Sequence, residues 1–238
     1  MNMFEMFGDV KDELSIFASQ LQKLVLMAEQ AYETNEHDRA IIRSLLESIA
    51  TEFYVEQNMW RENAKAHRDQ LRVVGVPHSE VPKLDVFTAY LDVAYTAMAN
   101  NAVRDDEKLH ALSVLRATFK NLLSANGDLF NVVTSNKVDG VRDGKRVIYN
   151  FSDLMRRGKG VAMAQLVNVI GFAVGNLHDG DVVIFHGAER IDEGIRDYVN
   201  DQLAHLFFHG GRVVYIYNDI DKLLSDRSFN NFDKADYT

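Results

Sequence analysis

Polar residues with reactive side chains follow two apolar runs near the C-terminus. His186 comes directly after Val182–Phe185, Glu189 lies three residues further on, and Asn218 follows Arg212–Tyr217. Open α/β sheets bind ligands beyond the carboxyl ends of their strands, so the three side chains are expected at one edge. A carboxylate and an imidazole there can exchange protons with a substrate. We therefore predict Glu189 and His186 as catalytic candidates at that edge.

Each of these residues also has a purely structural interpretation. Glu189 can be a solvated glutamate at a helix N-terminus, and His186 a hydrogen-bonded histidine that ends a strand. Asn218 and Asp219 can form an Asx turn that begins the next helix. The basic segment Arg156–Gly160 precedes a helix and could contact an anion, but a solvated loop explains it equally well.

Several familiar site patterns are absent from the 238 residues. The sequence has no G-x-x-x-x-G-K-[ST] phosphate loop and no G-x-S-x-G nucleophile elbow. It contains no cysteine and no paired carboxylates with metal-site spacing. We therefore predict no metal site.

The elements that must position the candidate residues fall into two regions. Apolar residues at helical spacing predict an all-helical region over residues 1–125. Its helices are expected over about 14–28, 38–57, 85–100 and 105–124, with a proline-bracketed loop at 76–83. In residues 126–238, helices over 161–174 and 192–208 separate three runs rich in β-branched and aromatic residues, Arg146–Phe151, Val182–Phe185 and Arg212–Tyr217. Such alternation predicts an α/β fold with a parallel sheet of at least three strands.

Charge and hydropathy limit the classes of partner. The formal net charge of −9 does not support strong nucleic-acid binding by this chain, because phosphate contact needs clustered lysine and arginine. No signal peptide or run of apolar residues long enough to span a membrane is evident. A cytoplasmic protein is the simplest expectation.

Five segments occur in an order that resembles one family. They are Leu129–Thr134, Arg146–Ser152, Met163–Gln165, Val182–Ala188 and Gly211–Asn218. Together they resemble the type IV secretion ATPases of conjugative elements, the VirB/TraC-like hexameric motors with a RecA-like fold. The resemblance implies that residues 1–125 are the helical insertion of such a motor and that 126–238 are part of its RecA-like domain. It also implies that the chain is a fragment that starts after the phosphate loop.

The family resemblance carries functional expectations. ATP and Mg²⁺ are implied for the full motor, whereas no cofactor is expected for this chain alone. The partners implied are further subunits of a secretion complex, with a homo-hexamer in the full motor, in the cytoplasm or at the inner face of the cell membrane. ATP hydrolysis by the isolated chain is not expected.

Position by position, the match to the family is partial. His186 and Gly187 stand where the family has the Asp-Glu pair of the magnesium site. Glu189 lies two places beyond the family's glutamate and could substitute for it. Asn218 stands where the family has a glutamine that senses the terminal phosphate, which makes it the cofactor-binding candidate.

Two other functions remain compatible with the sequence. The chain could be a non-catalytic α/β interaction module that docks through its helical region, and the missing phosphate loop favours that alternative. It could also be a small-molecule enzyme, although no constellation of residues indicates one.

Overall fold

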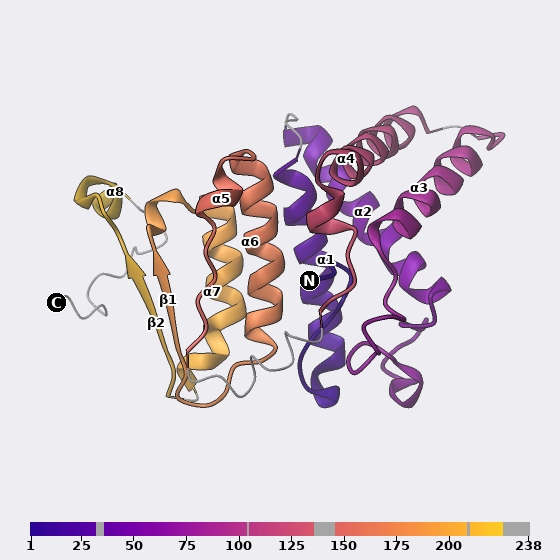
Figure 1. Ribbon diagram of the computed structural model, residues 1–238. Helices are drawn as coiled ribbons and strands as arrows, with labels where there is room; N and C mark the ends of the chain where they lie inside the picture. The colour runs from indigo at the N-terminus through magenta and orange to yellow at the C-terminus, as the bar shows by residue number, and fades with distance from the viewer. Residues whose placement is uncertain (32–35, 104, 136–145, 209, 226–238) are drawn as a thin grey trace. The chain divides into compact units, whose positions relative to one another are not determined.

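The computed structural model describes residues 1–31, 36–103, 105–135, 146–208 and 210–225 (Figure 1). The chain divides into two compact units, Met1–Asn176 and Leu177–Thr238. We call the first the helical unit and the second the α/β unit, and we describe each by itself.

The helical unit is built from long helices joined by loops. Its elements are η1 (Val10–Asp12), α1 (Glu13–Glu29), α2 (Glu36–Glu56), η2 (Arg68–Gln70), α3 (Leu84–Ala99), α4 (Asp106–Phe130), α5 (Ser152–Met155) and α6 (Lys159–Val174). The expected ranges of α1, α2, α3 and α6 agree with these bounds to within two residues, because their apolar residues recur with the helical period. No helix in the described part of the chain is long and apolar enough to cross a membrane.

Helix α4 is longer than the sequence predicts. Asp105 caps it by accepting a hydrogen bond from Lys108 N at 3.1 Å. Asn126-Gly127, a sequence that favours turns, lies inside the helix, and only Asn126 leaves helical geometry, with φ −137° and ψ 29°. The helix continues because Phe130, beyond this kink, is fully buried, and its burial outweighs the local turn preference.

The N-terminal segment forms the centre of the helical unit. Phe4 is completely buried, and its ring lies 5.7 Å from Phe53 of α2 and 5.1 Å from Phe87 of α3. Phe87 in turn lies 5.1 Å from Phe119 of α4. Edge-to-face contacts of this kind stabilise aromatic clusters beyond their buried area, so the segment joins three helices into one core.

The segment's main chain is satisfied by buried polar side chains. Asn2 N donates to Thr134 Oγ1 at 2.9 Å, and Asn2 Nδ2 donates to the Pro82 carbonyl at 2.9 Å. Gln20 Nε2 donates both to the Met3 carbonyl at 2.9 Å and to the Tyr54 hydroxyl at 2.7 Å. Buried main-chain groups need such partners, and these bonds fix the path of the segment.

Helix α6 belongs to the helical unit. It packs along α1, and Phe172 contacts Phe7 with ring centroids 4.8 Å apart. The boundary predicted after residue 125 separates a helical insertion from part of a RecA-like domain, and it remains a prediction. The compact unit of this structure reaches Asn176 because α6 buries its apolar residues with α1.

The α/β unit contains a two-stranded parallel sheet. Strands β1 (Val182–His186) and β2 (Arg212–Ile216) pair with Val182 opposite Arg212 and His186 opposite Ile216. Helix α7 (Glu193–Phe208) connects them and contacts β2, as Figure 1 shows, and Tyr198 and Val199 of this helix are buried. Phe185 and Tyr215 stack across the strands with centroids 5.1 Å apart. A short helix, α8 (Ile220–Ser225), follows β2.

The third strand predicted at Arg146–Phe151 is wrong. Residues 146–151 have neither helix nor strand geometry, and Ile148 is 73% exposed. A strand requires a neighbour that satisfies its main chain, and apolar β-branched composition does not supply one. The described residues therefore form a mostly helical protein with a small parallel sheet.

Candidate functional site

The carboxyl ends of β1 and β2 lie at one edge, as two parallel neighbours require. The chain turns sharply after His186, where Gly187 adopts a left-handed conformation with φ +76° and donates its N–H to the Ile216 carbonyl at 2.9 Å. The short 3-10 helix η4 (Ala188–Arg190) follows. This turn directs the chain over the end of β2, and it places Glu189 beside the residues that leave that strand.

Glu189 and Asn218 form a closed hydrogen-bonded pair at this edge. Asn218 Nδ2 donates to Glu189 Oε1 at 2.9 Å, and Asn218 N approaches Oε2 at 3.3 Å. The side chain of Glu189 is only 14% exposed. The Asn218 amide holds the pKa of the Glu189 carboxyl below its usual value, because hydrogen bonds to the carboxylate favour the charged form. Glu189 is thus an ionised, oriented acceptor rather than a proton donor.

The Asx-turn alternative applies to Asp219 and not to Asn218. Asp219 Oδ1 accepts a hydrogen bond from Asp221 N at 2.9 Å, which caps the start of α8. The neighbouring Asn218 is therefore left to engage Glu189. Asp219 therefore caps α8, and Asn218 forms the hydrogen bonds to Glu189.

His186 is not part of the pair. Its side chain is exposed at the end of β1, and alternation along a strand places it on the sheet face that carries Val182 and Ile184. Of the three predicted residues, the structure brings Glu189 and Asn218 into contact and leaves His186 without a hydrogen bond to either. Their catalytic and nucleotide-binding roles remain predictions.

The described residues at this edge do not by themselves form a site for Mg²⁺ and ATP. Magnesium takes carboxylates, phosphates and water as ligands, whereas His186 and Gly187 at the end of β1 supply no carboxylate. The nearby carboxylate, Glu189, already accepts from Asn218. No group of three or more potential ligands occurs among the described residues, and the sequence has no phosphate loop.

The basic segment before α6 is a solvated loop with one structural anchor. Arg157 forms a two-point ion pair with Asp128 of α4, at 2.8 and 2.7 Å. Arg156 is 85% exposed and lies 3.5 Å from Asp153. The arrangement favours the solvated-loop interpretation over a preformed anion site.

Sequence reasoning missed a polar cluster in the helical unit. Glu5 and Lys23 are 4% and 3% exposed, and Glu5 Oε1 is in close contact with His78 Nδ1. One signal was available, since Glu5 interrupts the apolar run Met3–Phe7 and would have to be either exposed or paired.

One solved structure resembles the chain over almost its full length. It is VirB4 of Thermoanaerobacter pseudethanolicus, with a TM-score of 0.67 over 94% of this chain and 16% sequence identity. At this identity the likeness establishes a shared fold and not a shared activity. The chain covers 55% of the VirB4 chain, which is about half its length. No protein-family model and no curated protein sequence matches the chain.

Proposed function

We propose that this chain acts in type IV secretion, as a portion of a conjugative secretion ATPase related to VirB4. The observation that carries the proposal is the likeness to VirB4 over 94% of the chain. The order of the family-like segments along the sequence supports the proposal independently of the structural likeness. That order concerns residue types, whereas the likeness concerns the path of the backbone.

In this proposal the chain does not hydrolyse ATP by itself. Its α/β unit has Glu189 and Asn218 at the carboxyl edge of β1 and β2, and this pair would face a nucleotide that other parts of the motor bind. The helical unit would transmit the state of the motor to DNA or protein transfer. The partners would be further subunits, in a homo-hexamer.

Transfer of a conjugative element tests the secretion role. The host's reading frame is deleted, the transfer of a marked element is counted, and the wild-type gene is returned as a control. We expect a loss of transfer that the returned gene restores. Unchanged transfer after clean deletion would contradict the proposal.

Calorimetry with ATP and Mg²⁺ tests the nucleotide part separately. We expect no measurable binding to the isolated chain, because the edge lacks both the phosphate loop and the acidic pair. Micromolar binding that Glu189→Gln abolishes would overturn this part and leave the secretion role standing.

A non-catalytic interaction module is the second candidate. The observation that favours it is His186-Gly187 in place of two acids. The candidates differ in one result. A module restores transfer with Glu189→Ala as well as with the wild type, whereas a motor portion that uses the pair does not.

A further inference from the structure

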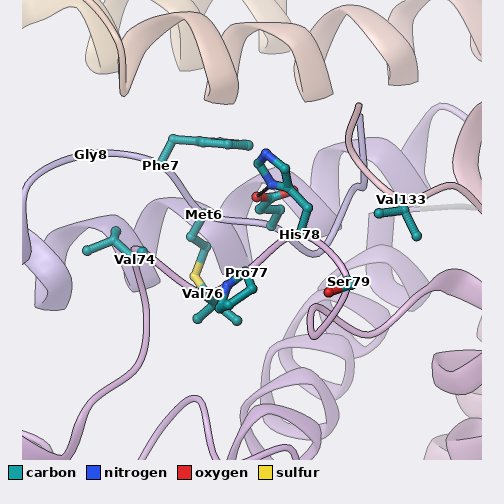
Figure 2. Close-up of a pocket in the computed structure, with 11 residues that line it drawn as sticks. Met6, Phe7, Gly8, Val74, Val76, Pro77, His78, Ser79 and Val133 are labelled. Carbon is teal, nitrogen blue, oxygen red and sulfur yellow. Dashed lines mark hydrogen bonds and ion pairs between the residues drawn. The ribbon is translucent and has the colours of Figure 1, made fainter. Parts of the chain in front are cut away.

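A groove in the helical unit lies between the N-terminal segment and the loop that precedes α3. Its volume is about 590 Å³, which falls within the range of small-molecule sites. Residues 5–8 form one wall, residues 74–79 form the other, and Val133 contributes from a third segment. Figure 2 shows Val74 and Val133 at opposite ends of the groove with His78 between them.

Buried polar side chains hold both walls in place. Lys23 Nζ donates to the Glu5 carbonyl at 3.2 Å, which fixes the first wall. Glu13, only 5% exposed, accepts hydrogen bonds from Val73 N at 3.0 Å and Val74 N at 3.3 Å, which fixes the start of the second. The main chain of both walls is therefore held by the protein's own hydrogen bonds.

The floor of the groove carries a carboxylate that is only partly satisfied. Glu5 is 4% exposed; its Oε1 contacts His78 Nδ1, while its Oε2 has no hydrogen-bond partner among the described residues. Lys23 bonds to the main-chain carbonyl of Glu5 and not to this carboxylate. The Lys23 and Met1 amines act on this carboxylate through their charge, but burial lowers the pKa of both. A buried carboxylate oxygen without a hydrogen-bond donor is unfavourable, so the site still lacks a donor that a ligand can supply.

Polar and apolar groups line the groove in about equal measure. Met6, Phe7, Val76, Pro77 and Val133 line it, so they would accept an aliphatic stem. A divalent metal ion is disfavoured because Glu5 and His78 supply only two ligand side chains, and no group of three was found among the described residues.

We propose that this groove binds an alkylammonium or alkylguanidinium group. Both a basic side chain of a protein partner and a free polyamine offer this chemistry. The cationic head bonds to the Glu5 carboxylate, and the stem extends from it toward Val133. Because Glu5 Oε2 is covered, the head displaces the His78 ring, so His78 competes with the ligand for Glu5.

Agmatine is the first probe, titrated into the full chain by calorimetry and followed by NMR. We expect saturable binding that weakens roughly tenfold in Glu5→Gln, the effect of losing one charge-assisted hydrogen bond. His78→Ala should strengthen binding, because it removes the competitor. Glu80→Gln is the matched control, since Glu80 is half exposed and paired with Arg72, and it should leave the affinity unchanged.

A second pair of variants keeps the proposal testable if Glu5→Gln fails to fold. Val133→Trp fills the groove from its exposed end and should abolish agmatine binding. Val103→Trp places the same ring at a residue that is 84% exposed and does not line the groove, so binding should persist. Equal affinities of the wild type, Glu5→Gln and Val133→Trp would overturn the proposal, as would the absence of any binding.

The two sources of the cation are separated by comparing ligands. A blocked tripeptide, Ala-Arg-Ala, that binds more tightly than agmatine indicates a protein partner. Spermidine that binds more tightly than the tripeptide indicates a free polyamine. A neutral analogue such as pentanol that binds as well as agmatine contradicts both.

Discussion

Lys23 places an ammonium group in the core of the helical unit, where water cannot stabilise its charge. Burial lowers its pKa to about 7, and the nearby Glu5 carboxylate offsets only part of this effect. The ordinary pKa of lysine is 10.5. Between these values the unfolded chain binds a proton that the folded chain does not, so the free energy of unfolding rises with pH in this window.

Lys23→Met should remove this pH dependence. The slope from one such group is at most about 1.4 kcal/mol per pH unit, and it disappears below pH 7, where both states are protonated. We expect Lys23→Met to be more stable than the wild type at pH 6, with a difference that shrinks toward pH 9 in urea denaturation. Lys11→Met, at a largely exposed site, is the control. A difference that stays constant with pH would show that Lys23 is charged throughout.

Asn218→Ala should release Glu189. The amide of Asn218 is the main cause of the lowered pKa of Glu189, so we expect this pKa to rise toward its ordinary value. An NMR titration of the Glu189 side-chain carboxyl measures the change. Asn121→Ala, at an exposed position of α4, is the control and should leave the pKa of Glu189 unchanged. An unchanged pKa in Asn218→Ala would show that another group holds the carboxylate.

The left-handed conformation of Gly187 limits which residues can replace it. A residue with a side chain is disfavoured in the left-handed conformation of Gly187. A glutamate placed there would also have to share the turn with the Glu189–Asn218 pair. A glutamate at position 187 is therefore unfavourable in this turn.

At the scale of elements, the N-terminal segment is the part that holds the helices together. Phe4→Ala should destabilise the helical unit by about 3 to 5 kcal/mol, because a buried ring surrounded by other rings leaves a cavity. Urea denaturation followed by circular dichroism measures this loss. Val10→Ala, at a side chain that is 68% exposed, should change stability by less than about 0.5 kcal/mol. A small loss for Phe4→Ala would mean that α2 and α3 pack without it.

The elements differ in how well the sequence predicts them. Helices α1 and α3 follow from local periodicity, which any amphipathic helix must show. The strand predicted at Arg146–Phe151 fails because strand formation depends on a distant partner that local composition does not reveal. The segment Met3–Phe7 has no periodicity at all, so its place in the core became visible only in three dimensions.

The candidate site was predictable in part for the same reason. Parallel strands end at one edge, which is why Glu189 and Asn218 could be expected near each other. The hydrogen bonds between them depend on the turn at Gly187. The alternation of side chains along β1 places His186 on the sheet face that carries Val182 and Ile184, and not in the pair. The groove beside Glu5 joins residues about 70 positions apart, such as Glu5 and His78, and no local pattern connects them.

At the scale of the whole molecule, the two units differ in how much core they possess. The helical unit buries a cluster of rings, whereas the α/β unit has two strands with Ile184 60% exposed. A small sheet with one uncovered face is marginally stable on its own. Hydrogen exchange followed by mass spectrometry should therefore show faster exchange in β1, β2 and α7 than in α1, α2 and α4. Equal protection of the two units would indicate that they unfold as one.

The bond between Asn2 and Thr134 spans 132 residues of sequence, and this has a consequence for how the protein is made. The residues around Phe4 are core residues whose partners in α2, α3 and α4 are synthesised after them. At about 5 to 20 residues per second, roughly 6 to 25 seconds separate the synthesis of Phe4 from that of the end of α4. Until the last of these helices has followed, the apolar, aromatic segment lacks part of its cover, so we expect the nascent chain to bind chaperones that recognise such segments.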